Sequence, residues 1–182
     1  MSNHLPNLLD QFGQLIATPS VSSTSANWDM GNRAVIDLLA SWLSDLGFNT
    51  EIQTLADSSK ANLIASLGSG PGGLVLAGHT DTVPFNEERW SADPLKLLEK
   101  DNRLYGLGST DMKGFFPIAI EAAKFALGKP LKQPLIILAT ADEESSMNGA
   151  RALAAAGKPL GRQAIIGEPT GLRPVRMHKG IM

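Results

Sequence analysis

Residues 74–85 read LVLAGHTDTVPF, an apolar run followed by His79 and Asp81, with Pro84 close behind. An apolar run of this length is typical of a strand that is buried on both faces. Residues i and i+2 of a strand point to the same side, so the imidazole and the carboxylate leave the strand together. The stretch therefore predicts a buried strand that ends in polar side chains with a chemical role.

The spacing of apolar residues predicts alternating helices and strands on either side of this stretch. Helices are expected over residues 8–16, 30–46, 112–127 and 146–156, and strands over 48–55, 61–68, 73–78, 134–141 and 163–168, with a hairpin over 95–106 and one more strand beginning near 173. Alternation of this kind, with near-continuous apolar strands, favours an α/β fold: a mostly parallel, twisted sheet with helices on both faces.

Composition limits the class of protein and the kind of site. The 182 residues are 43% hydrophobic and 19% charged, as in one globular domain, and the formal net charge of -2 gives no case for nucleic acid or an anionic membrane as a partner. The N-terminus lacks the pattern of a signal peptide and no apolar run is long enough to span a membrane, so a cytoplasmic protein is expected. There is no cysteine, so any metal site must use His, Asp and Glu.

Acidic residues recur where the predicted strands end. Glu143 and Glu144 follow one apolar run, Glu168 follows another, and Asp111 lies in a glycine-rich turn before a helix. In open α/β sheets functional groups collect beyond the carboxyl ends of the strands. Carboxylates crowded there repel one another, and a bound dication removes that penalty. With His79 as a nitrogen donor we expect zinc, with cobalt or manganese as alternatives.

The local patterns indicate separate tasks within such a site. Asp81 is placed to accept a hydrogen bond from the ring nitrogen of His79 that does not hold metal. Of the neighbours Glu143 and Glu144, one is expected to hold metal while the other takes a proton from water.

Each motif also has a plainer interpretation. His79 could be a packed core histidine, the acids at 142–144 could favour a helix dipole, Asp111 could cap a helix and Glu168 could lie on the surface. A magnesium site that handles phosphate is a further alternative, which His79 disfavours because magnesium prefers oxygen ligands. The coincidence of all four motifs at strand ends favours the metal site.

Four motifs resemble those of the co-catalytic zinc family of aminoacylases, desuccinylases and carboxypeptidases, in the same order and spacing: GHTDTVP, YGLGSTDMKG, ATADEESS and IIGEPT. The sequence around these motifs is similar to the acetylornithine deacetylase branch of that family. The resemblance implies a three-layer catalytic domain. It further implies that His79 and Glu168 are ligands of the first zinc, that Asp81 is the carboxylate that orients His79, and that Asp111 bridges two zincs. Glu144 would be a ligand of the second zinc, and Glu143 the general base.

The family also has a lid domain that carries the dimer contact, and a later histidine ligand for the second zinc. The resemblance therefore implies that residues 1–182 are the N-terminal part of the catalytic domain, truncated before the lid and the C-terminal part. Neither His4 nor His178 is assigned as a ligand. The intact enzyme is expected to be a homodimer.

The implied reaction is metal-dependent hydrolysis of an N-acyl amino acid, with N-acetyl-L-ornithine, converted to L-ornithine and acetate in arginine biosynthesis, as the expected substrate. This chain is expected to be weak or inactive alone. The alternatives are a desuccinylase, aminoacylase or dipeptidase of the same family, or a metal-binding fragment without catalysis.

Overall fold

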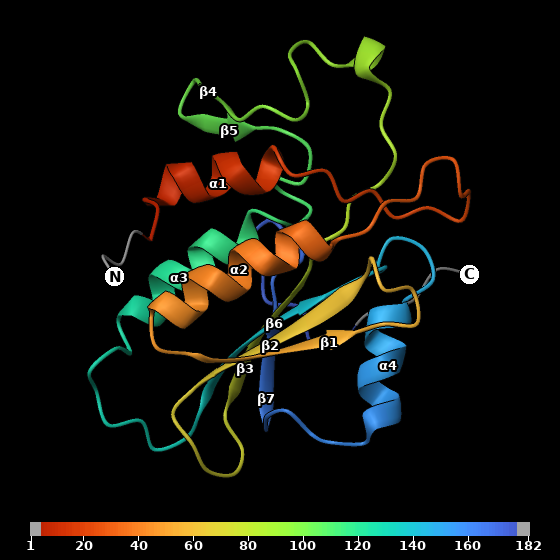
Figure 1. Ribbon diagram of the computed structural model, residues 1–182. Helices are drawn as coiled ribbons and strands as arrows, with labels where there is room; N and C mark the ends of the chain where they lie inside the picture. The colour runs from red at the N-terminus through yellow and green to blue at the C-terminus, as the bar shows by residue number, and fades with distance from the viewer. Residues whose placement is uncertain (1–4, 178–182) are drawn as a thin grey trace.

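Strand β3, Leu74–His79, is an inner strand of the sheet in the computed structural model, which describes residues 5–177. It pairs in parallel with β6 (Leu135–Thr140) on one side and with β7 (Gln163–Ile166) on the other. Strands β2 (Ala61–Leu67) and β1 (Asn49–Thr54) complete a five-stranded sheet in the order β1-β2-β6-β3-β7. Figure 1 shows β3 crossing the middle of the molecule.

The α/β class is confirmed, but the sheet is mixed rather than mostly parallel. The pairs β1–β2 and β2–β6 are antiparallel, whereas β6–β3 and β3–β7 are parallel. Residues 55–60 are the only link between β1 and β2, and a link this short forms a hairpin and not a parallel crossover. The parallel half of the sheet is therefore the half that carries the predicted site.

Helices cover both faces of the sheet, as the sequence predicted. Helices α2 (Arg33–Asp45) and α3 (Phe115–Lys124) pack on one face, and α1 (Leu8–Ile16) lies over α3 (Figure 1). Helix α4 (Asn148–Ala156) lies on the other face, where Asn62 of β2 donates a hydrogen bond of 2.9 Å to the main-chain oxygen of Gly149. Ala61 and Leu63, the neighbours of Asn62, face the opposite way, into the core beneath α2.

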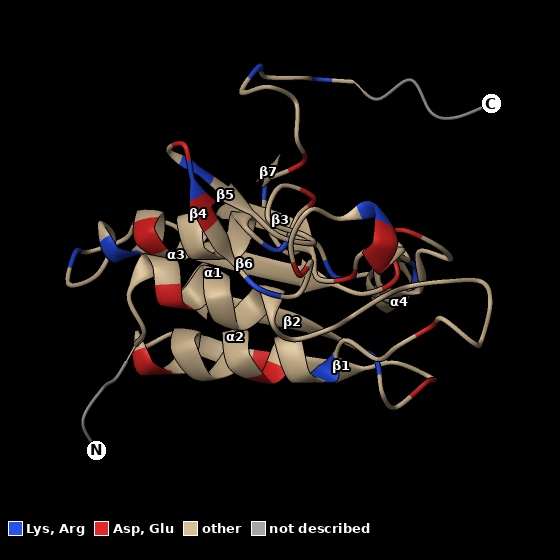
Figure 2. Ribbon diagram, turned by 90° about the horizontal axis from the view of Figure 1, so that it is seen from above, with Lys and Arg blue, Asp and Glu red and all other residues tan. Residues whose placement is uncertain are grey.

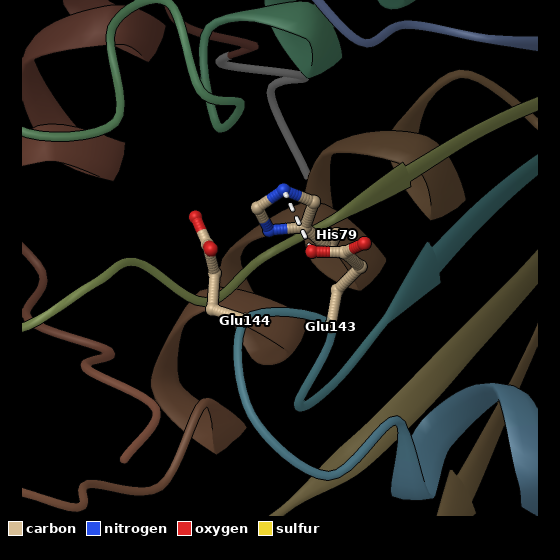
Figure 3. Close-up of side chains that lie close together, drawn as sticks. All are labelled: His79, Glu143 and Glu144. Atoms are coloured by element: carbon tan, nitrogen blue, oxygen red, sulfur yellow. Dashed lines mark ion pairs between the residues drawn. The ribbon is translucent and has the colours of Figure 1, made fainter. Parts of the chain in front are cut away.

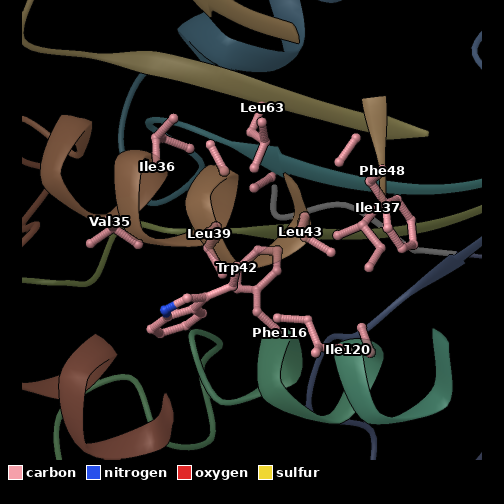
Figure 4. Packing of buried hydrophobic residues seen from close by; sticks show 14 of the residues in the cluster. Val35, Ile36, Leu39, Trp42, Leu43, Phe48, Leu63, Phe116, Ile120 and Ile137 are labelled. Carbon is pink, nitrogen blue, oxygen red and sulfur yellow. The ribbon is translucent and has the colours of Figure 1, made fainter. Parts of the chain in front are cut away.

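The core lies between the sheet and helices α2 and α3 (Figure 4). Leu39 and Leu43 of α2 meet Leu63 of β2, and all three side chains are fully buried. Gly78 allows α3 to come close to β3, because a Cβ atom there would lie 2.7 Å from Met112 Cε and 3.2 Å from Phe116 Cζ. This close contact fixes the end of β3 against the turn that precedes α3.

The remaining elements lie at the surface. The hairpin of β4 (Leu98–Lys100) and β5 (Arg103–Tyr105) is confirmed, with Asp101 and Asn102 in the left-handed region that such tight turns require. A short 3₁₀ helix spans Glu87–Arg89. Basic and acidic positions are interspersed along the chain (Figure 2). None of the helices in residues 5–177 has the length and apolar character needed to cross a membrane.

Several helix boundaries and one strand differ from the sequence predictions. Helix α3 ends at Lys124, three residues earlier than expected, and α4 begins at Asn148, two residues later. Helix α2 begins at Arg33, three residues later than expected. The side chain of Asn32 makes hydrogen bonds with the main chain of Ala61, which ties the chain to β2 just before the helix begins. Helix α3 begins at Phe115 because residues 109–114 form the turn that carries Asp111. The strand expected near 173 is absent from residues 173–177, and its remainder, with His178, lies outside the described residues, as does His4.

Candidate metal centre

His79 is the last residue of β3 and is almost fully buried, with 2% of its surface exposed. Its Nδ1 atom lies 2.9 Å from the main-chain oxygen of Asp81. A carbonyl oxygen can only accept a hydrogen bond, so Nδ1 carries a proton and donates it. The other ring nitrogen, Nε2, is thereby left to face the acidic side chains.

Three carboxylates from separate segments surround Nε2. Its distances are 3.1 Å to Asp111 Oδ1, 3.7 Å to Glu168 Oε1 and 3.9 Å to Glu143 Oε2. The segments are the turn before α3, the end of β7 and the end of β6, so the carboxyl ends of the parallel strands meet as expected. Each of these carboxylates is partly exposed to solvent, which leaves the centre open on one side.

The side chains form two groups in which one ligand atom per residue lies within 4.8 Å of the others. The first group is His79, Asp111 and Glu168, and the second is His79, Glu143 and Glu144. Figure 3 shows the His79 ring between the two glutamates, with Glu143 on one side and Glu144 on the other. The structure thus brings together every residue that the sequence proposed as a metal ligand.

Asp81 lies beside Nδ1, but its contact differs from the one expected. The main-chain carbonyl accepts the ring proton, and carboxylate atom Oδ1 is 3.6 Å from Nδ1, too far for a hydrogen bond. The second carboxylate oxygen, Oδ2, accepts the main-chain N–H of Glu144 at 3.0 Å. Buried Oδ1 has no hydrogen-bond partner within residues 5–177, so Asp81 presents a free lone pair toward the imidazole.

The charges in this centre shift its protonation equilibria. Burial lowers the pKa of His79, but the negative charges of Asp81, Glu168 and Glu143 outweigh it and raise the pKa to about 9. Burial, together with repulsion from Asp111 and other nearby carboxylates, raises the pKa values of Glu144 and Glu168 above their usual range. For Asp81, burial is outweighed by the His79 ring and by main-chain N–H groups, so its pKa is lowered. The same field that holds a second proton on His79 favours any cation beside Nε2.

The donor atoms fit a divalent transition metal. One neutral imidazole nitrogen with several carboxylate oxygens suits zinc, and the same set accepts cobalt or manganese. The main-chain carbonyl of Asp81 fits as well, because a ligating histidine is oriented by an acceptor behind its other nitrogen. These side chains could therefore hold a metal ion without rearrangement of the strands that carry them.

A cavity of about 550 Å³ opens beside the centre. Its lining includes Asp111 and Glu144 of the centre together with Trp90, Arg103 and Tyr105. Cavities of this size accept small molecules. No sequence pattern pointed to the last three residues, because they come from loops and a short hairpin whose position depends on tertiary packing.

Comparison with known proteins shows which family this chain is similar to. The model of peptidase family M20/M25/M40 matches residues 75–179, which include every side chain of the centre. The chain belongs to this family. The matched residues make up more than half of the chain and include the motifs that form the centre.

Curated M20 relatives are similar over the whole chain. The acetylornithine deacetylase of Klebsiella pneumoniae (strain 342) is 54% identical over 183 residues, and that of Proteus mirabilis (strain HI4320) is 55% identical over 181 residues. The alignments cover 100% and 99% of this chain but 48% and 47% of those proteins. The chain therefore spans about half the length of these relatives.

Solved structures support the M20 fold. Human carnosine dipeptidase 1 superposes with a TM-score of 0.69 at 24% identity, over 84% of this chain and 35% of that one. The M20 family metallo-carboxypeptidase Sso-CP2 from Sulfolobus solfataricus gives a TM-score of 0.70 at 18% identity, over 89% of this chain and 37% of that one. At these identities the similarity concerns the fold alone.

The raised pKa of His79 predicts a pH dependence of stability in the metal-free chain. The pKa is about 9 in the folded state and about 6.5 in an unfolded chain, so the contribution of His79 to stability is complete below about pH 6.5 and is lost as the pH rises through 9. Urea unfolding with a chelator at about pH 6 and about pH 9.5 measures this loss.

His79→Gln is the control, because it removes this titration and keeps the others. One of the remaining titrating groups is buried Lys113, whose pKa is lowered from 10.5 to about 8 by burial. Its effect on stability has the opposite sign to that of His79, because the folded chain gains stability as the pH rises from 8 toward 10.5. The wild-type chain should lose more stability between the two pH values than His79→Gln. Equal pH dependence in both proteins would contradict the charge field described above.

Proposed function

We propose that this chain forms the N-terminal part of the catalytic domain of a metal-dependent amidohydrolase that cleaves N-acyl amino acids, with N-acetyl-L-ornithine as its substrate. The hydrolase class rests on one observation, the convergence of His79, Asp111 and Glu168 around one point. The choice of substrate rests on the similarity over the whole chain to acetylornithine deacetylases.

Two metal positions account for the arrangement of the ligands. His79 Nε2, one oxygen of Asp111 and Glu168 would hold the first cation, since these atoms already form one group. The other oxygen of Asp111, together with Glu144, would hold a second cation. Zinc is the expected metal, because the donor set is one imidazole with carboxylates, and cobalt or manganese would substitute.

Glu143 is the proposed general base. Its Oε2 lies 3.9 Å from His79 Nε2 and the side chain is partly exposed, so it reaches both the metal position and solvent. A divalent cation bound in this centre supplies Lewis-acid polarisation of the amide carbonyl. Glu143 would take a proton from the attacking water at a carboxylate oxygen and then deliver it to the nitrogen of the leaving amine.

Asp81 is proposed to orient the centre. Its carbonyl fixes the proton on Nδ1 of His79, which leaves Nε2 as the nitrogen that binds metal once its own proton is released. Its carboxylate accepts a hydrogen bond from the main-chain N–H of Glu144. One residue thus supports both proposed metal positions. Such contacts raise the basicity of a ligand and fix its direction.

The wider setting is proposed from similarity alone. Arginine biosynthesis, a cytoplasmic location and a homodimer joined through a lid domain follow from the resemblance to the deacetylases. The same chemistry would serve a desuccinylase, an aminoacylase or a dipeptidase, and a chain that binds metal without catalysis is the remaining alternative. The identity of 54% over 183 residues favours the deacetylase among them.

Metal content and turnover test the proposal together. In this assignment the first position has three ligands, His79, Asp111 and Glu168, which lie in one group. The second has only Asp111 and Glu144, so one zinc per chain should bind more tightly than a second, and hydrolysis of N-acetylornithine should be weak or absent. Equilibrium dialysis with metal analysis gives the stoichiometry. The full-length Klebsiella pneumoniae relative, assayed in parallel, serves as the reference for turnover.

Two tightly held zinc ions with turnover equal to that of the reference would contradict this account of the ligands. If hydrolysis is measurable, N-acetylornithine should exceed N-succinyl-diaminopimelate, other N-acyl amino acids and dipeptides. A preference for any of these substrates would shift the assignment to the corresponding alternative.

The role of Glu143 has its own test. Glu143→Gln should keep the metal and lower any hydrolysis by about 10²- to 10⁴-fold, the range that general acid–base catalysis contributes. Glu51→Gln, an exposed position on β1, is the matched control and should change neither quantity. Hydrolysis that survives Glu143→Gln unchanged would show that the base is a different residue.

A further inference from the structure

A buried lysine outside the proposed centre is linked to it through one aspartate. Lys60 lies just before β2, and its side chain is only 7% exposed. Its Nζ donates to both carboxylate oxygens of Asp29, at 2.9 and 2.7 Å, and to Oδ1 of Asp142 at 2.6 Å. The Asp142 side chain is 2% exposed, so the contact between Lys60 and Asp142 is almost completely removed from water.

Lys60 remains charged in this position. Burial lowers its pKa, but the hydrogen bonds and charges of Asp142 and Asp29 outweigh burial and raise the pKa above the usual value. Removing one partner of such a buried pair leaves the other charge uncompensated. The structure therefore couples Asp142 tightly to the presence of the ammonium group.

The Asp142 carboxylate is held by four donors. Oδ1 accepts Lys60 Nζ and the hydroxyl of Ser22 at 3.1 Å, and Oδ2 accepts the hydroxyl of Ser146 at 3.3 Å and the amide of Asn148 at 3.1 Å. The donors come from separate loops and from the start of α4. Among them only Lys60 carries a charge, so it supplies the strongest of these hydrogen bonds.

This arrangement sets the course of the chain into the centre. Asp142 has a φ of 62°, in the left-handed region, so the chain bends sharply at the end of β6. The side chain of Asp142 turns into the interior, while the next two residues, Glu143 and Glu144, lie on either side of His79 (Figure 3). At the far side of this bend, the Glu144 N–H is held by Asp81.

We propose that Lys60 is a positioning residue for the Glu143–Glu144 pair: it holds Asp142 in the interior and thereby fixes the main chain that directs both glutamates beside His79. The inference rests on the proposed function, because it assigns the two glutamates to a metal-dependent site. Without the ammonium group, the Asp142 carboxylate would leave its buried position, and the bend that carries Glu143 and Glu144 would move with it. Groups that support metal ligands from behind change metal affinity by about 10- to 100-fold.

Titration of the full chain with Co²⁺ alone tests the proposal, with the visible absorption of the ion as a measure of its ligand geometry. Lys60→Met should weaken Co²⁺ binding by about 10- to 100-fold and alter the absorption bands. Lys124→Met is the matched control, since Lys124 also pairs with an acid, Glu121, but on the surface of α3. It should leave both readouts unchanged.

Lys60→Arg tests whether the charge is what matters. A cavity of about 300 Å³ lined in part by Lys60, Asp142 and Asn148 leaves room for the larger guanidinium, which can bond both aspartates. The Lys60→Arg chain is therefore expected to recover most of the affinity that Lys60→Met loses. A purely stabilising role for Lys60 would lower the melting temperature of Lys60→Met and leave the Co²⁺ affinity and spectrum of the folded protein unchanged.

The outcomes separate the inference from the proposed function. A wild-type chain that binds no Co²⁺ would overturn the metal centre and the inference with it. A wild-type chain that binds Co²⁺, and a folded Lys60→Met that binds it equally with the same spectrum, would overturn only the role of Lys60. If circular dichroism shows that Lys60→Met does not fold, the double variant Ser146→Ala/Asn148→Ala takes its place, because it removes two neutral donors to Asp142. This double variant should also weaken Co²⁺ binding, and unchanged binding would overturn the inference.

Discussion

Negative charge concentrated around one buried imidazole is the constraint that orders this structure. Asp111, Glu143 and Glu168 approach Nε2 of His79 to within 3.9 Å, from segments that are far apart in the sequence. Carboxylates held this close repel one another, and burial adds to the cost. A positive charge at Nε2 offsets both terms, whether it is a proton, as the raised pKa of His79 indicates, or a divalent cation.

Strands, helix α3 and the contacts of Asp81 hold the acidic side chains together against this repulsion. Parallel strands β3, β6 and β7 end at one edge of the sheet, and Gly78 lets α3 come close enough to bring Asp111 to the same edge. Behind the ring, Asp81 fixes the tautomer of His79 and the main chain of Glu144. Each acidic side chain of the centre therefore lies in a turn or short segment that directly adjoins a strand or helix, so these elements set its place beside His79.

Local sequence patterns predicted the α/β class, most element positions and the residues of the centre, because apolar runs identify buried strands and the ends of parallel strands must meet. The direction of β1 and β2 was missed, since pairing depends on the partner strand and not on the pattern within the strand. The contact of Asp81 through its carbonyl was missed because side-chain alternation does not specify which atoms meet. Lys60 gave no signal at all: its partner Asp142 lies 82 residues away, and only the folded chain brings them together.

X-ray absorption spectroscopy of the zinc-loaded chain tests the central claim most directly, because it reports the atoms bound to the metal. The account predicts a nitrogen- and oxygen-ligated zinc with the multiple-scattering signature of a single imidazole, and loss of that signature in a His79→Gln chain. A spectrum of fully hydrated zinc, or one in which the imidazole signature persists after His79 is replaced, would contradict it.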